Sequence, residues 1–192
     1  MKIFVDRLSP TPQEFEFEAD SAWWRQAISP GRDLPQDLPE PLRFQVEAYT
    51  AADHLVVQGK VRGAVSLECS RCLARYRQGL RESFRVVLEP AGLRKPADPE
   101  GAEALKRDGF CLSEDVGSGW YRGDEIDMGP FFQEVVSLAL PVKPLCREEC
   151  KGLCGRCGAD LNQGPCGCPE IENESPFAVL QQLRDGFTRG ED

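Results

Sequence analysis

The chain has 192 residues, of which 41% are hydrophobic and 29% are charged, so it can bury one sizeable core beneath a polar surface. Its net charge of −9 argues against nonspecific binding to nucleic acid or to an anionic membrane, because both carry negative charge themselves. No run of about 18 uncharged apolar residues occurs, and we therefore expect no membrane-spanning helix.

The beginning of the chain and its nine cysteines bear on the compartment. Residues 1–6 lack the apolar core and the small-residue cleavage site of a signal peptide, so we expect a cytoplasmic protein. In a reducing cytosol, closely paired cysteines hold metal more often than they form disulfides.

The first third of the chain predicts two strands and a short helix. Apolar residues alternate or nearly alternate over residues 1–8 and 13–19, as in half-buried strands. Residues 21–28, which include two tryptophans, predict a short helix. Residues 29–41 contain four prolines in a polar setting and predict an extended connection.

Three longer runs rich in strand-forming residues follow, at 42–49, 55–67 and 74–88. Turn-forming residues lie between them, at 50–54 and around 69–72. This order predicts an antiparallel meander. Residues 90–119 are rich in proline, glycine and charge without a clear period, and they predict an irregular, partly mobile surface excursion.

Regular structure is expected again from residue 120. Residues 120–127 predict a last strand, and Asp127 is a plausible N-cap for a helix that Pro141 ends. Helical spacing relates the apolar residues Phe131, Phe132, Val135, Val136 and Ala139. After a cysteine-rich segment, Ser175 and Pro176 predict the start of a final helix. Its apolar face consists of Phe177, Leu180, Leu183 and Phe187.

The sequence thus predicts an α+β fold with a mainly antiparallel β-domain, flanking helices and a C-terminal cysteine-rich zinc segment. We divide the chain into a β-domain with the long helix over residues 1–145 and a zinc-binding segment with the C-terminal helix over 146–192.

The cysteine-rich segment 146–168 has the sequence CREECKGLCGRCGADLNQGPCGC. Two residues separate Cys154 from Cys157, as in a zinc knuckle, which lets both sulfurs reach one ion about 2.3 Å away. Gly158 follows, where a relaxed backbone lets amides point at the thiolates. Cys166 and Cys168 can supply the other two ligands. Four cysteines close a tetrahedral site without an open position for water, which predicts a structural zinc ion.

Two further cysteine pairs predict a second structural zinc site. Cys69 and Cys72 lie at a predicted strand turn, and Cys146 and Cys150 precede the knuckle. Neither pair alone saturates a zinc ion, but the two together can, if the fold brings the turn beside the end of the long helix. Cys111 is then left alone, as an incidental free thiol.

Other uses of these cysteines remain open. Cys69 and Cys72 could form a redox pair, although such motifs favour a helix N-terminus in a thioredoxin-like unit, and here strands surround them. Cys150 could replace Cys166 or Cys168 in the knuckle site. An iron–sulfur cluster also suits four cysteines, although the close knuckle spacing favours zinc.

With both cysteine groups in place, the chain resembles the YceD family, the large ribosomal RNA subunit accumulation proteins of bacteria and plastids. The resemblance covers residues 42–187 and, more loosely, the first strands. Its matching segments are 67–73 (LECSRCL), 124–127 (DEID), Glu134, 138–141 (LALP), 144–146 (PLC), 150–154 (CKGLC), 157–158 (CG), 161–162 (LN), 166–168 (CGC) and 176–180 (PFAVL).

The resemblance implies a role in producing or accumulating large-subunit ribosomal RNA during ribosome assembly. The partner would be that RNA or a pre-ribosomal particle. Some family members lack the knuckle cysteines and keep the earlier pair, which agrees with two separable sites. The family provides no catalytic residue to carry over to this chain.

Charge is distributed unevenly, and this suggests two binding surfaces. Residues 42–95 contain ten Lys/Arg and five Asp/Glu, a net of +5, which leaves −14 for the rest of the −9 total. On one continuous strand, five arginines share a face, which Lys60 and Arg62 of the preceding strand can extend: Arg71, Arg75, Arg77, Arg81 and Arg85.

This basic face could contact RNA phosphates, because arginine presents planar donors to phosphate oxygens. It could equally be a solvated sheet face with cross-strand charge pairs, since edge strands often carry such charge. The acidic remainder suits a basic ribosomal protein or assembly factor, which defines an alternative function as a protein-interaction module without RNA contact.

Catalysis is not expected. The single histidine, His54, lies in a predicted turn, and no nucleophile motif or glycine-rich phosphate loop occurs. Asp124, Glu125 and Asp127 resemble a carboxylate group for nuclease chemistry, but more simply they lead into a helix and cap it. We therefore expect no enzyme activity and no small-molecule substrate.

Overall fold

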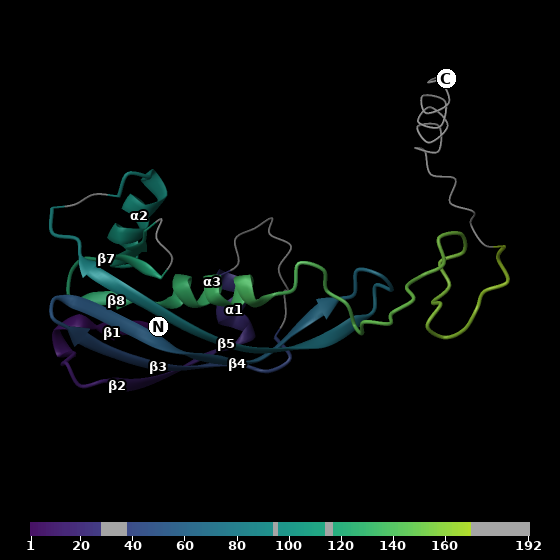
Figure 1. Ribbon diagram of the computed structural model, residues 1–192, viewed down its shortest axis with the longest axis horizontal. Helices are drawn as coiled ribbons and strands as arrows, with labels where there is room; N and C mark the ends of the chain where they lie inside the picture. The colour runs from purple at the N-terminus through teal and green to yellow at the C-terminus, as the bar shows by residue number, and fades with distance from the viewer. Residues whose placement is uncertain (28–37, 94–95, 114–116, 170–192) are drawn as a thin grey trace, which may run out of the picture.

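The computed structural model describes residues 1–27, 38–93, 96–113 and 117–169. Within them the chain forms one large sheet, one small sheet and three α-helices (Figure 1). The α+β class, with a mainly antiparallel sheet, is confirmed. The expected helix at 175–187 and most of the proline-rich connection at 29–41 lie outside the described residues. No helix in the described ranges is both long and apolar enough to span a membrane.

The large sheet has six strands in the order β2-β3-β4-β5-β7-β6, and all neighbours are antiparallel except β5 and β7. Its strands are β2 (Gln13–Ala19), β3 (Leu42–Ala51), β4 (His54–Glu68), β5 (Arg75–Pro90), β6 (Phe110–Leu112) and β7 (Ser118–Tyr121). The expected meander corresponds to β3, β4 and β5. A second sheet pairs β1 (Lys2–Phe4) with β8 (Glu125–Asp127).

β4 and β5 form the longest hairpin of the fold. Their pairing runs without interruption from Leu55↔Leu88 to Glu68↔Arg75. β3 pairs with β4 only as far as Arg62, so beyond this point β4 and β5 continue as a two-stranded ribbon (Figure 1). The ribbon carries the turn that contains Cys69 and Cys72 away from the body of the sheet.

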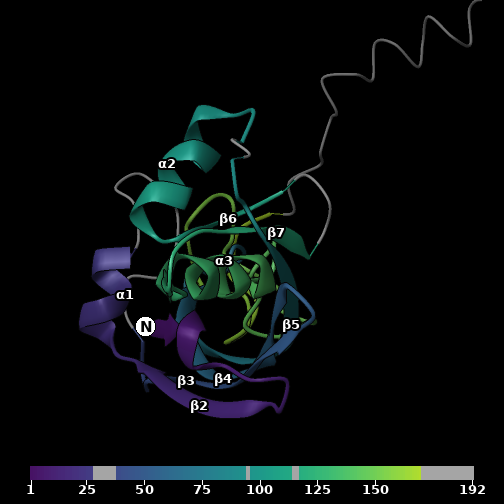
Figure 2. The same ribbon diagram turned by 90° about the vertical axis from the view of Figure 1, so that its left-hand side faces the viewer.

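The core lies between the sheet and α3 (Gly129–Ala139), which occupies the hollow of the curved sheet (Figure 2). Phe132 is fully buried and stacks on Phe44 of β3, with ring centroids 4.4 Å apart. Phe84 of β5 contacts both Phe131 and Phe132. α1 (Ser21–Ala27) completes this side with the fully buried Trp24. Alternation along β3 and β5 therefore places apolar side chains under the helices and charged ones on the opposite face.

The prediction that residues 90–119 form an irregular excursion is wrong. They contain α2 (Pro99–Arg107) and β6, and they end in β7. Asp98 caps α2 by accepting a hydrogen bond from the Gly101 amide. A small second core of Ala91, Leu105 and Cys111 holds α2 to β6, with Trp120 packed against it. The sequence did contain a start signal for α2, because Asp98 followed by Pro99 is typical of a helix N-terminus, but it lies within a run of prolines, glycines and charged residues.

Three predicted boundaries also differ from the structure. The strand expected over 120–127 is split, because β7 ends at Tyr121 and β8 pairs with β1 in the other sheet. The strand expected over 1–8 ends at Phe4 and continues as a 3-10 turn, Val5–Arg7. Asp127 is not the N-cap of α3. Met128 occupies that position, while the Asp127 carboxylate accepts from the Gly129 amide at 2.9 Å and pairs with the N-terminal ammonium at 3.2 Å.

The packing of Phe132, on α3, against the sheet leads to a prediction about stability. We expect Phe132→Ala to lower the free energy of unfolding by about 3–5 kcal/mol, because it leaves a cavity where four phenylalanine rings meet. Leu138→Ala on the same helix is the matched control. Leu138 is 79% exposed, so its truncation should cost less than about 0.5 kcal/mol. Urea unfolding followed by circular dichroism measures both, and equal losses would contradict this packing.

Candidate functional site

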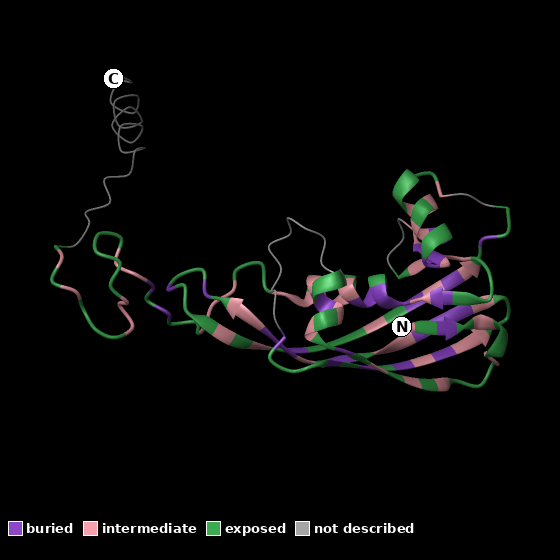
Figure 3. Ribbon diagram, turned by 180° about the vertical axis from the view of Figure 1, so that it is seen from behind, coloured by how far each residue is buried: buried purple, intermediate pink, exposed green. Residues whose placement is uncertain are grey.

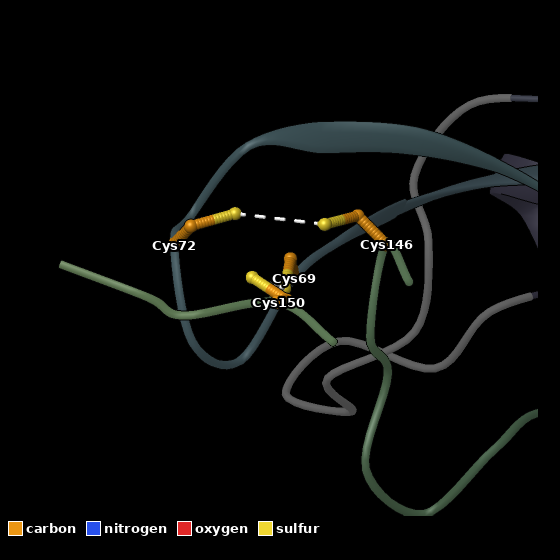
Figure 4. A group of neighbouring side chains, drawn as sticks. All are labelled: Cys69, Cys72, Cys146 and Cys150. Carbon is orange, nitrogen blue, oxygen red and sulfur yellow. Dashed lines mark hydrogen bonds between the residues drawn. The ribbon is translucent and has the colours of Figure 1, made fainter. Parts of the chain in front are cut away.

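The structure brings four cysteine sulfurs together at the tip of the β4–β5 ribbon, and we call this group cluster 1. It consists of Cys69, Cys72, Cys146 and Cys150 (Figure 4). The sulfurs all lie within 4.8 Å of one another. The Sγ atoms of Cys69 and Cys150 are 3.8 Å apart, and those of Cys72 and Cys146 are 3.7 Å apart. Two pairs separated by more than 70 residues thus form one donor set, which can hold a metal ion.

Backbone hydrogen bonds place the two halves of cluster 1. In the ribbon turn, the Cys69 amide donates to the Ala74 carbonyl at 2.9 Å, and Leu73 adopts a positive φ of 57°. The segment after α3 then attaches to this turn, because the Ser70 amide donates to the Pro144 carbonyl at 2.9 Å. These bonds bring the turn beside the end of the helix, which is the arrangement that the predicted second site requires.

Arg71 fastens the segment further. Its guanidinium donates to the carbonyl of Cys150 at 2.7 Å and to that of Glu148 at 3.1 Å, and its own carbonyl accepts from the Leu153 amide at 3.1 Å. Gly152 has a φ of +79°, and a Cβ there would lie 2.9 Å from the Arg71 carbonyl oxygen. Glycine is therefore required where the cysteine-rich segment crosses the ribbon turn.

A second group of four sulfurs follows directly, and we call it cluster 2. It consists of Cys154, Cys157, Cys166 and Cys168, with all sulfurs within 4.8 Å of one another. The Cys154 amide donates to the Ala159 carbonyl at 2.8 Å, and the Gly158 amide donates to the Cys154 carbonyl at 2.9 Å. Gly158 has a φ of +72°, the conformation that the position after a knuckle was expected to need. Cluster 2 is more exposed than cluster 1 (Figure 3).

Each cluster contains one cysteine with a strongly lowered pKa. A backbone hydrogen bond from Cys146, with further ones from Arg71 and Cys72, lowers the pKa of Cys69 to about 6. Backbone hydrogen bonds from Cys157 and Arg156 lower the pKa of Cys154 to about 6. Backbone amides thus stabilise the thiolate above about pH 6, and the thiolate is the form of cysteine that binds metal.

Four other cysteines of the clusters have a raised pKa, and the shift is largest for Cys146 and Cys168. Burial, together with hydrogen bonds to the other sulfurs, raises the pKa of Cys146 to about 12. A hydrogen bond with Cys157, together with burial, raises the pKa of Cys168 to about 12. Four sulfurs this close cannot all be anionic without a compensating cation, because like charges repel. The donor sets therefore have the electrostatics of cation sites.

Tyr76, on β5, is a neighbour of cluster 1 that the sequence did not single out for this role. Its ring packs against Cys69, Cys72 and Cys150. Within the described parts of the chain, its hydroxyl is a buried polar atom without a hydrogen-bond partner. Burial, and then the charge on Cys69, raises its pKa.

The ninth cysteine belongs to neither cluster. Cys111 is 3% exposed and packs with Ala91 and Leu105 in the second core. Burial raises the pKa of its thiol. It is a free thiol with the packing role of a small apolar side chain.

The predicted arginine face is present, with one correction. Arg75, Arg77, Arg81 and Arg85 all lie on β5 with exposed side chains and share one face. Arg71 does not belong to this face, because it lies in the turn before β5 and binds the carbonyls of the cysteine segment. Arg77 forms an ion pair with Glu40.

Arg43 of β3 adds a basic residue that the sequence analysis missed. The register aligns Arg43 with Arg62, and Arg62 with Arg81, so three arginines stand in a row across β3, β4 and β5. Lys60 lies one row further along, between Gln45 and Ser83. Among the residues that the structure describes, Lys60, Arg62, Arg81 and Arg85 form no ion pair. Cross-strand register was the missing information, and strand patterns alone do not provide it.

The face of the sheet that carries the arginine row is acidic over β2. β2 exposes Glu14, Glu16 and Glu18, of which Glu18 pairs with Arg43 at 3.5 Å. Glu47 accepts a hydrogen bond from Gln58 at 3.0 Å. We call the arginine row with Lys60 and Arg85 the basic face, and the β2 glutamates with Glu47 the acidic strip.

The residues weighed for catalysis have structural partners. His54 lies at the start of β4, with its Nε2 3.6 Å from a Glu89 carboxylate oxygen at the surface. Glu125 pairs with Lys2 at 2.6 Å, and the Asp124 carbonyl accepts from the Val5 amide at 2.8 Å. Together with Asp127, these acidic residues hold the N-terminal strand against β8.

Comparison with known proteins agrees with the resemblance noted in the sequence. The family model described as "Large ribosomal RNA subunit accumulation protein YceD" matches residues 57–184. No solved structure matches the chain.

Curated relatives include plant and mycobacterial proteins. The chain is 25% identical over 170 residues to "Large ribosomal RNA subunit accumulation protein YCED homolog 1, chloroplastic" of Arabidopsis thaliana. The aligned region covers 81% of this chain and 53% of the relative. Its counterpart in Zea mays is 26% identical over 156 residues, covering 71% of this chain and 52% of the relative. An uncharacterized protein of Mycobacterium leprae is 25% identical over 144 residues, covering 74% and 59%. The chain thus spans about half the length of the curated relatives it matches. Because the family model covers most of its length, the chain belongs to the YceD family.

Proposed function

We propose that this chain is a non-enzymatic zinc-binding factor that supports the accumulation of large-subunit ribosomal RNA during ribosome assembly. The two closed groups of four cysteine sulfurs carry the zinc part of the proposal. Family membership supports the ribosomal part. In a reducing compartment, such as the cytoplasm expected from the sequence, the thiols stay available for metal.

The sulfur geometry favours a single tetrahedral ion in each cluster. Zinc–sulfur bonds of about 2.3 Å in a regular tetrahedron place neighbouring sulfurs about 3.8 Å apart. The two sulfur pairs in cluster 1, Cys72–Cys146 and Cys69–Cys150, are separated by 3.7 and 3.8 Å. Sulfurs that all lie within 4.8 Å of one another surround one ion and leave no room between them for several iron atoms.

Four cysteine ligands also favour a structural role over a catalytic one. Such a site is coordinatively closed, so water or substrate has no position on the metal. The segment 151–169 has no buried apolar side chain of its own. Metal-binding energy is therefore the main source of folding energy for this segment.

The basic face supports direct contact with RNA. Like charges opposite one another on neighbouring strands destabilise a sheet, so the Arg43–Arg62–Arg81 row has a cost in the free protein. Edge protection does not explain Arg43 and Arg62, because β3 and β4 have strand neighbours on both sides at these residues, whereas Arg81 lies where β5 is paired only with β4. An RNA backbone would neutralise the row, and arginine suits its phosphates.

The acidic strip supports a second candidate function. Glu14, Glu16 and Glu18 present three carboxylates on one strand face, and only Glu18 has an ion-pair partner within the described ranges. Such a strip fits a basic ribosomal protein or assembly factor. In this alternative the chain is a zinc-stabilised interaction module that does not contact RNA.

Metal content tests the zinc proposal. We expect about two zinc ions per purified chain by inductively coupled plasma mass spectrometry. Cys69→Ser and Cys154→Ser should each retain about one ion, because each removes a ligand from a different cluster. Cys111→Ser is the matched control and should retain both. An unchanged zinc content in Cys154→Ser, or iron in place of zinc, would contradict the assignment.

Removal of metal should unfold the cysteine segment first. We expect a chelator to expose residues 143–169 to limited proteolysis while the amides of β3, β4 and β5 stay protected from hydrogen exchange, because the Phe132 core does not depend on metal. Mass spectrometry of the fragments locates the cleavage. Cleavage that begins in the sheet, or a pattern that the chelator leaves unchanged, would count against this role.

Charge reversal separates the two functions. We expect Arg62→Glu with Arg81→Glu to weaken binding to large-subunit ribosomal RNA by roughly tenfold or more, with a shallower salt dependence, because phosphate contacts are lost. Arg25→Glu with Lys106→Glu makes the same change of charge on α1 and α2 and should have little effect. Filter binding at several salt concentrations measures both pairs. Equal effects of the two pairs would favour protein-mediated association.

A further inference from the structure

Asn162 links the two cysteine clusters. It lies between Cys157 and Cys166, within the loop that cluster 2 closes. Its side-chain amide nevertheless donates to the Cys150 sulfur of cluster 1 at 3.5 Å. A residue that cluster 2 positions therefore contacts a ligand of cluster 1.

Two other side-chain hydrogen bonds, with a third from the backbone amide, hold Asn162 in this orientation. Its Oδ1 accepts from the Lys151 amide at 2.9 Å, one residue after Cys150. Its Nδ2 also donates to Asp160 Oδ1 at 2.6 Å, and the same oxygen accepts from the Asn162 amide at 3.0 Å. Because Asp160 fixes which end of the amide points to sulfur, Nδ2–H is the group presented to Cys150.

The position of Asn162 depends on the loop around it. The loop meets the rest of the segment through the Leu161 amide, which donates to the Gly152 carbonyl at 2.9 Å, and through the bridge between Leu153 and Asp160. No buried apolar side chain supports residues 158–165. Metal in cluster 2 is then the main constraint that holds the loop in the conformation that brings Asn162 to Cys150.

We propose that Asn162 is a positioning residue that couples the two clusters, so that metal in cluster 2 raises the metal affinity of cluster 1. The inference rests on the proposed zinc binding and goes beyond it, since two structural sites need not be coupled. An ion with four thiolate ligands leaves net negative charge on the sulfurs, and an N–H donor to sulfur stabilises that charge. Coupling between binding sites is reciprocal, so metal in cluster 1 raises the affinity of cluster 2 by the same factor.

The size of the effect follows from such outer hydrogen bonds at other metal sites. Loss of a partner that orients or stabilises a ligand lowers metal affinity by about 10- to 100-fold. The single Asn162 bond to sulfur is long at 3.5 Å, which places the expected factor near the lower end, at about tenfold.

Zinc affinity of cluster 1 in the full-length chain, measured by competition with a chelator, tests the coupling. Four proteins are compared: the wild type, Cys154→Ser/Cys157→Ser without cluster 2, Asn162→Ala, and the three changes together. We expect the loss of cluster 2 and the loss of Asn162 each to weaken cluster 1 by about tenfold or more. Adding Asn162→Ala to the protein without cluster 2 should cause little further loss, because both remove the same hydrogen bond.

Cadmium-113 NMR provides a readout that general loosening of the loop would not produce. With cadmium in both clusters, Asn162→Ala should shift the resonance of cluster 1 and leave that of cluster 2 in place. The protein without cluster 2 should give only the cluster 1 resonance, which identifies both signals in the wild type. Gln163→Ala is the matched control, because Gln163 donates only to Asp160, at 3.2 Å, and should change neither affinity nor spectrum.

The outcomes separate this inference from the proposed function. If the chain binds two zinc ions and Asn162→Ala leaves the zinc affinity of cluster 1 unchanged, the coupling is overturned and the zinc proposal stands. Losses that multiply in the combined variant would overturn it as well, since they would show independent effects. A wild-type chain that binds no zinc would refute both the zinc proposal and the coupling.

Discussion

The uninterrupted ladder between β4 and β5 is the constraint on which both candidate sites depend. It runs from Leu55↔Leu88 to Glu68↔Arg75, and the first part is buried under α3 while the last part leaves the sheet as a ribbon. Its buried part sets the register that aligns Arg62 with Arg81. Its free end carries Cys69 and Cys72 away from the main core, to a small cluster of their own. One pairing therefore determines both where charge accumulates and where the sulfurs of cluster 1 come together.

Cluster 1 closes the longest loop among the cysteine contacts. Cys72 and Cys146 are 74 residues apart, and Cys69 and Cys150 are 81 apart. A metal ion bound there would crosslink the chain across this separation and restrict the unfolded chain strongly, as a disulfide does, while remaining compatible with a reducing environment. Arg71 and Ser70 prepare the site by holding the incoming segment through its backbone carbonyls. Organisation of the ligands before metal arrives lowers the entropic cost of binding.

The outer face of the sheet combines two opposite charges over a few strands. Three glutamates on β2 lie at one side, and the row of Arg43, Arg62 and Arg81 crosses β3, β4 and β5. Helices α1 and α3 lie on the other face, so they do not neutralise this surface (Figure 2). A net charge of −9 therefore conceals a local surface that suits an anionic partner. The net charge of the chain describes long-range repulsion, whereas binding depends on how the charged side chains are arranged on one surface.

The sequence by itself determined the features that depend on local spacing. Alternation located β2, and runs of strand-forming residues between turns located β3, β4 and β5 to within a few residues, because both signals are visible in a single strand. The knuckle spacing of Cys154 and Cys157, followed by Gly158, indicated a compact sulfur site, since two intervening residues suffice to turn the chain. The YceD resemblance came from the same short motifs.

Only the tertiary structure decided what depends on contacts between distant residues. It joined Cys69 and Cys72 with Cys146 and Cys150, aligned Arg43 with Arg62 and Arg81, and removed Arg71 from the basic face. It also packed α2 and β6 together in the second core, and brought Asn162 to the sulfur of Cys150. Register, docking and second-core packing arise from the whole chain, because their energies come from pairs of residues that no local pattern connects.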